Sequence, residues 1–541
     1  MIRHRILIIP ILLICAAIVW AAQSSIPVQD VPLVLQATPE LDRSVQLLNT
    51  ALQQRWSALD MQPAKPADEL QVLRRLSLAL HSTAPSLEEI RRFERDTQPH
   101  RLRRWTTKLL DDSRYGDAFA ERLARSLVGT ENGTFLVYRR DQFVVWLKQQ
   151  LLSNRNYAAI VREMLSAEGL WTSQPATNFV IAAYANKDFD EAKLASRTVR
   201  VFLGQRMDCA QCHDHPFDDA WQQTDFEGLA AFFGQTSLGV FGVEDRKIRN
   251  KQAVEYEIED RVTQKKRQVA PQVPYHSDWL PAEGRRRTRL AHWITHPENQ
   301  RFERATVNRI WGLVFGAPYM APVDDLPHPD PTEQDVLDVL GRDFREHGYD
   351  LKRLIQVIAA SNAFRLDSRH PAADDSRIDE FKSEWAVFPL VRLRPDQVIG
   401  AMFQASSIRT IDQHSHLLTR FKRFINEREF IDEYGDLGDR ELEQRSGTIP
   451  QALLRMNGKI ANEASRAELF NAASSVASMT QSDADCVDTS YLVCLTRRPD
   501  ADERRHFVSQ LREARNQNER KRIVEDMFWA LFNAPEFSWN H

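Results

Sequence analysis

Apolar residues recur along most of this chain with the spacing of amphipathic helices. After Asp68, apolar positions recur three or four residues apart from Leu70 to Leu80, which places them on one helical face. The same spacing predicts further helices at residues 105–110, 117–127, 142–152, 157–165, 192–203 and 226–233. Since no clear strand pattern interrupts these segments, we expect the chain to be helical up to about Phe233.

Three predicted helices share a start signal in which a capping residue follows a proline. The segments are Pro85-Ser86-Leu87-Glu88-Glu89, Pro331-Thr332-Glu333-Gln334-Asp335 and Pro499-Asp500-Ala501-Asp502-Glu503. Each has an acid three residues after the capping residue, as in a capping box, where both side chains accept hydrogen bonds from backbone N–H groups of the first turn. Each segment therefore predicts the first turn of a helix.

The pattern changes after Gly234. Residues 254–259 alternate apolar and acidic side chains, which is the period of a strand with one face towards water. Basic residues at 265–267 and an apolar stretch at 269–273 follow, so we expect a short β-hairpin. Because an exposed hairpin at a domain junction packs weakly, we expect limited proteolysis to cut first between residues 244 and 281.

These patterns predict a mainly α protein with two helical domains and a short β-hairpin element between them. The chain has 541 residues, enough for several domains that each bury a core. We expect an N-terminal signal or anchor at 1–22, a helical lead-in at 23–67, a first domain at 68–235, a junction at 236–284 and a second domain at 285–541. The formal net charge of -4 gives no basic excess for binding phosphates, so we predict no nucleic-acid partner.

The first 22 residues have the layout of an export signal. Arg3 and Arg5 precede an apolar run from Ile6 to Ala22 that ends in small residues. We expect an exported protein that is periplasmic after cleavage near Ala21 or Ala22, or that faces the periplasm from a membrane anchor if the segment is not cleaved.

The strongest chemical signal is the Cys-x-x-Cys-His pattern formed by Cys209, Cys212 and His213. This pattern attaches c-type haem, because two thiols three residues apart reach the two vinyl groups on one haem edge. The next imidazole then lies under the iron as an axial ligand. We therefore predict that these residues bind haem c, with His213 as ligand to the haem iron. Haem is attached covalently outside the cytoplasm, so the export signal agrees with this prediction.

The same cysteines have two other interpretations. Cys209 and Cys212 can hold zinc or non-haem iron with His215 as third ligand, and the distant residues that suit the fourth position are His292, His296 and His328. In that case His213 faces away, since adjacent residues rarely share an ion. The third interpretation is a disulfide with a structural or redox role.

Residues around the motif have supporting roles in these interpretations. Asp214 or Asp218 either accepts a hydrogen bond from a ligating imidazole or shapes a turn. By residue type, the methionines that suit the second axial position of the iron are Met164, Met207, Met402 and Met456. Met207, however, lies too close to Cys209 to cross to the opposite haem face.

Several other polar and cysteine residues are predicted to be structural. We expect Asp324 and Asp325 to be turn or cap residues, because prolines flank them. Helical spacing and polar type predict buried polar contacts for a group made of Arg304, Asn308, Arg309 and Trp311. Cys486 and Cys494 would lie about 12 Å apart on one helix, too far to form a disulfide.

Many separated motifs make most of residues 68–541 resemble two families in tandem. The first part is similar to the second planctomycete cytochrome-C-like domain through motifs that include Arg74-Arg75-Leu76, Tyr138-Arg139, Phe202-Leu203-Gly204, Cys212-His213-Asp214-His215 and Leu229-Ala230-Ala231-Phe232-Phe233. The second part resembles the planctomycete-specific domain that usually follows it, through motifs that include Arg289-Leu290-Ala291, Val307-Asn308-Arg309-Ile310-Trp311, Val323-Asp324-Asp325-Leu326, Gly348-Tyr349-Asp350-Leu351 and Phe528-Trp529-Ala530-Leu531. The resemblance implies a cytochrome-like function only through the Cys-x-x-Cys-His pattern itself.

We therefore expect an exported c-type-cytochrome-like protein that transfers electrons to a partner or supports the redox chemistry of a neighbouring enzyme. The alternatives are a non-haem metal-binding protein or metalloenzyme that uses the Cys/His cluster, and a structural or interaction scaffold. The sequence identifies neither the redox partner nor a catalytic residue, and it does not decide whether the protein is an enzyme.

Overall fold

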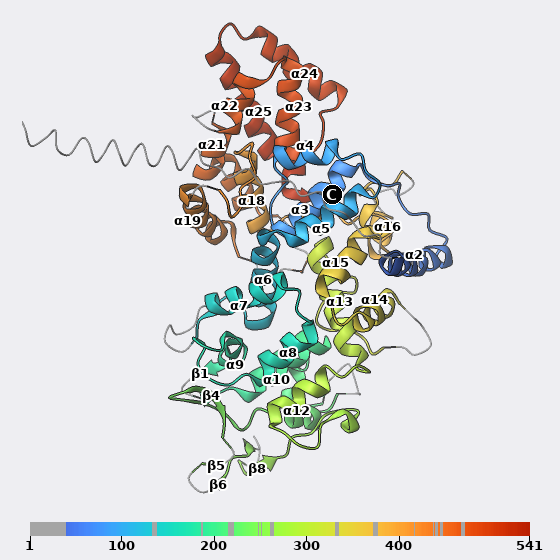
Figure 1. Cartoon of the computed structure of the whole chain (residues 1–541), viewed down its shortest axis with the longest axis vertical. Helices are drawn as coiled ribbons and strands as arrows, with labels where there is room; N and C mark the ends of the chain where they lie inside the picture. The colour runs from blue at the N-terminus through green and yellow to red at the C-terminus, as the bar shows by residue number, and fades with distance from the viewer. Residues whose placement is uncertain are drawn as a thin grey trace, which may run out of the picture.

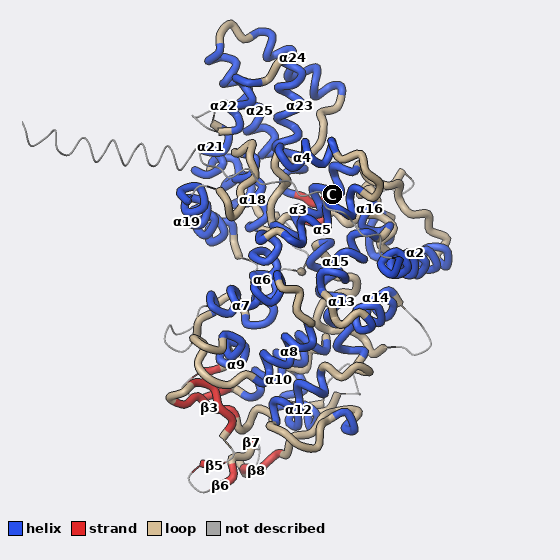
Figure 2. Tube along the Cα trace, viewed as in Figure 1, coloured by secondary structure: helices blue, strands red, loops and turns tan. Residues whose placement is uncertain are grey.

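The computed structural model describes residues 39–131, 138–185, 188–214, 221–246, 248–249, 252–259, 264–329, 335–371, 377–415, 417–436, 438, 442–443, 447–466 and 471–541. Within these residues the protein is mainly helical, as predicted, and its strands form short antiparallel pairs. The molecule is elongated, with the last helices at one end and β-hairpins at the other (Figures 1 and 2).

The helices of the first part of the chain contribute buried apolar residues to a common core. They are α2 (Pro39–Ala58), α3 (Glu69–His81), α4 (Leu87–Arg95), α5 (Arg101–Asp111), α6 (Ser113–Val128), α7 (Arg140–Leu152), α8 (Tyr157–Ser166), α9 (Asn178–Ile181), α10 (Glu191–Leu203) and α11 (Gln223–Ala230), with the 3-10 turns η1 (Pro175–Thr177) and η2 (Cys209–Gln211).

The second part of the chain is helical up to its last residues. Its helices are α12 (Arg286–Ile294), α13 (Gln300–Phe315), α14 (Val336–Glu346), α15 (Leu351–Ala360), α16 (Asn362–Arg365), α17 (Ile378–Ser383), α18 (Pro395–Ala405), α19 (Leu417–Tyr434), α20 (Ile449–Asn457), α21 (Lys459–Ser465), α22 (Ala472–Met479), α23 (Asp483–Leu495), α24 (Ala501–Glu513) and α25 (Gln517–Asn533), with the 3-10 turns η3 (Ser277–Trp279) and η5 (Pro535–Ser538).

The predicted hairpin between the two parts is confirmed. Strand β7 (Tyr256–Glu259) pairs antiparallel with β8 (Lys266–Val269), so Tyr256 lies opposite Val269. The neighbouring pairs are β3 (Thr236–Gly239) with β4 (Gly242–Asp245) and β5 (Ile248–Arg249) with β6 (Gln252–Ala253). Two further pairs lie outside this segment: β1 (Tyr184–Ala185) with β2 (Asp188–Phe189), and β9 (Val391–Arg392) with β10 (Trp539–Asn540).

Two of the three predicted capping boxes form where expected. Ser86 and Glu89 make reciprocal bonds at the start of α4, and Asp500 and Glu503 do so before α24. At the third helix the box is instead built by Asp335 and Asp338, at the start of α14. Residues 331–334 of the predicted segment lie outside the described residues.

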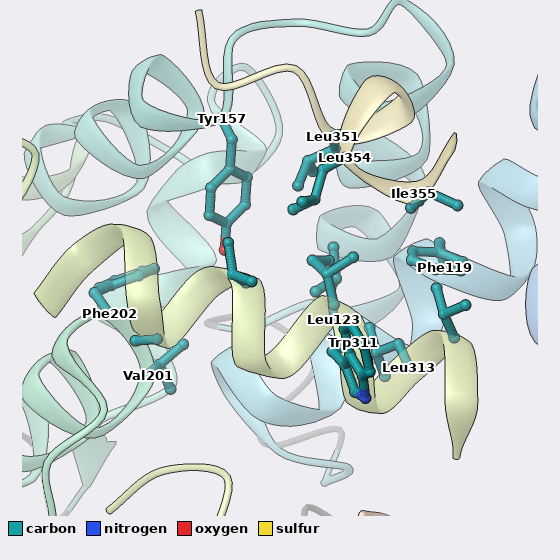
Figure 3. Close-up of a cluster of buried hydrophobic side chains, with 14 of the residues drawn as sticks. Phe119, Leu123, Tyr157, Val201, Phe202, Trp311, Leu313, Leu351, Leu354 and Ile355 are labelled. Carbon is teal, nitrogen blue, oxygen red and sulfur yellow. The ribbon is translucent and has the colours of Figure 1, made fainter. Parts of the chain in front are cut away.

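The largest core joins residues from both predicted domains. Helix α13 is its centre, because every residue from Arg301 to Phe315 is buried. Figure 3 shows Trp311 and Leu313 of α13 among Phe119 of α6 and Ile355 of α15. A second core contains mainly residues after 390, from α18 to η5. The five-part division expected from the sequence stays a prediction, since a shared core does not itself define a domain boundary.

Two buried arginines of α3 hold the end of the chain. Arg75 donates from Nε to the carbonyl oxygen of His541 over 2.8 Å, and its guanidinium lies 3.7 Å from the centre of the Phe388 ring. Arg74 donates to the carbonyl oxygens of Cys494 and Phe537, each over 3.3 Å. Burial lowers the pKa of Arg75 to about 9, so the charge is retained at neutral pH. These contacts explain structurally why two adjacent arginines stand in an otherwise apolar helix.

The predicted export segment at 1–22 lies outside the described residues. Among the helices that the structure does describe, none combines the length and the apolar character needed to cross a bilayer.

Candidate functional site

The Cys-x-x-Cys-His segment lies in a short turn that follows α10. That helix ends at Gly204, whose φ of +60° is left-handed and directs the chain out of the helix. A Cβ at Gly204 would also lie 3.0 Å from a methyl carbon of Leu326, so the position is tight as well as left-handed. Eight residues after Gly204, the backbone N–H of Cys212 donates to the carbonyl oxygen of Cys209 over 3.3 Å, which closes the turn η2.

This turn presents the two cysteines and the histidine to solvent while its other residues anchor it. Cys209 and Cys212 are exposed free thiols, and His213 is exposed as well. Met207 and Ala210 are fully buried, so the turn is fixed to the core from its inner side. The thiols therefore lie one turn apart and are accessible for covalent chemistry.

Asp214 makes two different contacts that orient the motif. Its carbonyl oxygen lies 2.7 Å from Nδ1 of His213, and because a carbonyl only accepts, Nδ1 donates and Nε2 is left with its lone pair. Its carboxylate accepts from the backbone N–H of Gln223 over 2.9 Å, at the first residue of α11. Asp214 thus connects the imidazole to the start of the next helix, through its backbone towards His213 and through its side chain towards α11.

Residues of the second part of the chain hold the loop that enters the motif. The backbone N–H of Leu326 donates to the carbonyl oxygen of Gly204 over 2.7 Å. The carboxylate of Asp325 accepts from the side chain of Gln205 over 3.2 Å and from the backbone N–H of Arg206 over 3.3 Å. Asp324, which is buried, accepts from Nε of Arg206 over 2.8 Å. We call these contacts of Asp324, Asp325 and Leu326 with residues 204–206 the loop clamp.

Two of the three histidines considered for a fourth metal position have ring or hydrogen-bond partners in the structure. Nδ1 of His328 accepts from Arg301 over 2.7 Å, and its ring stacks on Trp221. His296 stacks on Trp279 with ring centres 4.7 Å apart. His292 is exposed on α12, and burial and the charge of Arg162 lower its pKa.

The described residues contain no group of three or more His, Cys, Asp or Glu side chains placed to hold a metal ion. His215 and Asp218 lie outside the described residues, so the set Cys209, Cys212 and His215 stays a prediction.

The methionines considered for the second axial position are distributed over the two cores. Met164, Met207 and Met402 are fully buried, while Met456 is partly exposed on α20. Cys486 and Cys494 both lie on α23 as buried free thiols, so the condition of a shared helix, on which their expected separation rested, is met.

The polar residues of α13 have structural contacts. Arg304 pairs with Asp335 and Asp338 at the start of α14. The side chain of Asn308 donates to the carbonyl oxygen of Met320 over 2.8 Å and accepts from its N–H over 2.9 Å, which fixes the backbone there.

A crevice of about 1240 Å³ opens beside the motif and was not predicted from the sequence. Asp208, the residue before Cys209, lines it, as do Arg200, Arg206 and Met320. Its walls come from α10, the loop after α13 and the segment near Trp385, which are distant in sequence. No local pattern signals such a site, because only the packing of these segments forms it.

Comparison with known families identifies two of them along the chain. Residues 48–237 match the model described as PSCyt2, protein of unknown function (DUF1549). Residues 286–417 match the model described as PSD1, protein of unknown function (DUF1553). Comparisons with curated proteins and with solved structures gave no match. The loop clamp therefore joins one matched region to the other.

Proposed function

Because the chain belongs to the PSCyt2 and PSD1 families, whose descriptions assign no function, we propose its function from the chemistry of the site. The protein is an exported, c-type-cytochrome-like protein that binds haem c through Cys209, Cys212 and His213. The observation that carries this proposal is the 2.7 Å contact from Nδ1 of His213 to the carbonyl of Asp214, which leaves Nε2 as the ligand atom.

The donor set of this turn fits covalent haem. Each exposed thiol can add across one vinyl group, so that sulfur bonds to one vinyl carbon and the hydrogen goes to the other, with no oxidant required. Residues three apart in a 3-10 turn lie one above the other, so the turn η2 is compatible with two thioethers to a single haem edge. No other pair of cysteines among the described residues is exposed.

His213 and Asp214 would position the imidazole under the iron. A hydrogen bond from Nδ1–H to a backbone carbonyl fixes the tautomer and raises the basicity of Nε2. Asp214 is in turn held by the N–H of Gln223, so the imidazole is oriented by the start of α11. Asp218 is a further candidate for a supporting hydrogen bond, as the sequence predicted.

Bound haem would supply a one-electron redox couple, which suits electron transfer to a partner or redox support of a neighbouring enzyme. Export belongs to the same proposal, since covalent attachment takes place outside the cytoplasm. The protein would then work in the periplasm, either released after cleavage near Ala22 or attached to the membrane through residues 1–22.

The test is to produce the full chain in a host that matures c-type haem. We expect a haem signal that persists on a denaturing gel, because thioether bonds survive denaturation. Cys209→Ala combined with Cys212→Ala should abolish that signal, whereas Cys486→Ala with Cys494→Ala should leave it unchanged. A wild-type chain that is exported and folded but carries no covalent haem would overturn the proposal.

The alternative is a non-haem ion at Cys209, Cys212 and His215. It predicts zinc or iron in the purified chain without porphyrin, and release of the ion by His215→Ala. Covalent haem predicts porphyrin in the purified chain and no loss of iron in His215→Ala, because a residue two past the proximal ligand cannot reach the other face of the ring. Metal analysis of wild type and His215→Ala therefore separates the two functions.

A further inference from the structure

A smaller pocket lies beside the pairing of β9 with β10 and has a volume of about 490 Å³, which suits one small ligand. Its walls come from these two strands, the end of α13, the end of α19 and the start of α20. No residue of the Cys-x-x-Cys-His motif lines it, so its chemistry is independent of the proposed haem site.

The arginine that β9 contributes to this pocket has no acidic partner. Nη2 of Arg392 donates to the hydroxyl oxygen of Tyr434 over 3.2 Å. No carboxylate among the described residues forms an ion pair with Arg392. The positive charge of this side chain therefore remains uncompensated within the pocket.

The other charged residues of the pocket have partners of their own. The charged residues that line it are Arg122, Arg392, Arg394, Asp436 and Glu443. Asp436 pairs with Arg125, and Glu443 lies 3.9 Å from Arg206, so both acids face arginines from outside the pocket. Arg394 pairs with Asp396 over 2.7 Å, and Arg122 donates to the carbonyl oxygen of Leu313. Neither lining acid thus neutralises Arg392.

Arg455 of α20 is a second guanidinium group without an acidic partner at this end of the pocket. Gln451 lines the pocket, and Arg455 follows it by one turn on the same face of the helix. Nε and Nη1 of Arg455 are buried and have no hydrogen-bond partner among the described residues. Burial and the charge of Arg392 lower the pKa of Arg455. Because unpaired guanidinium donors are costly to bury, an oxyanion between the two side chains would stabilise both.

Tyr434 supplies a third donor beside the two arginines. It lines the pocket and is only 3% exposed. Its hydroxyl oxygen accepts from Arg392, and its own proton has no acceptor among the described residues. The hydroxyl group can therefore donate to a ligand oxygen that also contacts Arg392.

The charge and the opposite wall define the kind of ligand. Two uncompensated guanidinium groups match a dianion better than a singly charged group, since each positive charge then meets one negative charge. Leu390, which is 43% exposed, and Trp539 line the pocket and offer apolar surface to an organic substituent. A phosphate monoester is dianionic at neutral pH and combines both features.

We propose that this pocket binds a dianionic phosphate group, either as the monoester of a small organic compound or as free phosphate. Its oxygen atoms accept from Arg392, Arg455 and Tyr434. The organic part of a monoester lies against Leu390 and Trp539.

Binding is measured by calorimetry on the full wild-type chain near neutral pH and at constant ionic strength. The probes are phenyl phosphate, phenyl sulfate, which has a similar shape and one negative charge fewer, and inorganic phosphate. We expect phenyl phosphate to bind about tenfold more tightly than phenyl sulfate, because its second charge strengthens the hydrogen bonds from the arginines. Equal affinity for phenyl phosphate and phenyl sulfate, or no binding of either phosphate probe, overturns the proposal.

The same probes distinguish the two sources of the phosphate group. Tighter binding of phenyl phosphate than of inorganic phosphate identifies a monoester as the ligand. Tighter binding of inorganic phosphate identifies free phosphate.

Variants locate the site. Arg392→Gln and Arg455→Gln should each weaken phosphate binding about tenfold, while Arg512→Gln, on the exposed side of α24, should leave it unchanged. Because Arg455 has no acidic partner, Arg455→Gln leaves no carboxylate unpaired, and its melting temperature should not fall. Tyr434→Phe removes only the hydroxyl group and should weaken binding about threefold. Unchanged affinity in Tyr434→Phe or in folded Arg455→Gln contradicts the assignment.

Discussion

The carboxylate of Asp324 and the guanidinium group of Arg206 form an ion pair 2.8 Å long, and this pair joins the PSD1 region to the PSCyt2 region. Together with the hydrogen bonds of Asp325 it fixes residues 205 and 206, shortly before the Cys-x-x-Cys-His turn. One matched region thus positions the Cys-x-x-Cys-His motif of the other. This relationship gives a physical reason for the two regions to occur in one chain.

The loop clamp predicts that Asp325→Asn loosens the motif. The amide keeps one oxygen acceptor but loses the charge, so hydrogen exchange of residues 204–212 should accelerate about tenfold. Mass spectrometry of the exchanged peptides measures this directly. Asp335→Asn serves as the control, because it weakens another Asp–Arg pair, with Arg304, away from the motif. Equal exchange of residues 204–212 in Asp325→Asn and wild type would show that the clamp does not hold the loop.

Acid should weaken the protein partly through His81. Its Nε2 donates to the carbonyl of Leu109 over 2.9 Å, and burial and the charge of Arg114 lower its pKa to about 4. Between pH 6.5 and 4 the unfolded chain therefore binds a proton that the folded chain does not. Stability falls as the pH drops through this window, by on the order of 3 kcal/mol for this group.

The variant His81→Gln isolates that contribution. Its amide can still donate to Leu109, but it does not titrate. Urea unfolding should show that the free energy of unfolding falls less between pH 7 and pH 4.5 for the variant than for wild type. Glu89 and Asp112 also lose stabilising charge in acid, and their contribution is common to both proteins. Identical losses would contradict the role assigned to His81.

Trp311 should be the most costly truncation in the shared core. It is fully buried on α13 and contacts the rings of Phe315 and Trp385, with ring centres 4.4 and 5.1 Å apart. Trp311→Ala should destabilise the fold by roughly 3–5 kcal/mol through the cavity it leaves. Trp311→Phe should cost under about 1.5 kcal/mol, since the indole N–H has no hydrogen-bond partner to lose among the described residues. The urea midpoints of the two variants measure these losses of stability, and equal losses for Trp311→Ala and Trp311→Phe would refute this account.

The sequence predicted first cuts between residues 244 and 281, but the structure moves the expected first site for chymotrypsin to the tip of the β3–β4 hairpin, just before that range. Val240 and Phe241 are 90% and 84% exposed there. Mass spectrometry of the early fragments should identify a cut after Phe241, and Phe241→Ser should slow it at least tenfold, since the exposed tip supplies the aromatic side chain that the protease requires. Early cuts within α10 would show instead that the helical part opens first.

Local patterns predicted the elements well, and packing decided the rest. The recurrence of apolar residues after Asp68 located α3, and the alternation at residues 254–259 located β7, because each period belongs to one type of regular backbone. The burial of all sides of α3 from Val72 to His81, by contrast, depends on packing. The pairing of Val391 with Asn540 depends on the whole fold and has no local signal. Likewise, Asp335 with Asp338 has the same capping spacing as Thr332 with Asp335, so the local sequence did not decide between two start sites for α14.

In the candidate site, too, the sequence predicted the part that depends on local spacing and missed the part that depends on packing. Spacing alone predicted Cys209, Cys212 and His213, since the chemistry of the Cys-x-x-Cys-His pattern is contained in five residues. The loop clamp was missed, because Asp324 and Asp325 were expected only to shape a turn. Both carboxylates do lie between prolines, as expected for a turn, but the residues they bind are more than a hundred residues earlier in the chain. A long-range ion pair cannot be derived from one sequence by spacing.

Covalent haem is the central claim, and one experiment tests it most directly. Wild type, His213→Ala and the double variant Cys209→Ala, Cys212→Ala are produced in a host that matures c-type haem. Each is then examined by native absorption spectroscopy and by a haem stain on a denaturing gel. We predict a Soret band and a covalent haem signal in wild type, an altered spectrum wherever His213→Ala retains the haem, and no covalent signal in the double variant. A folded, exported wild-type chain without either signal would contradict the account.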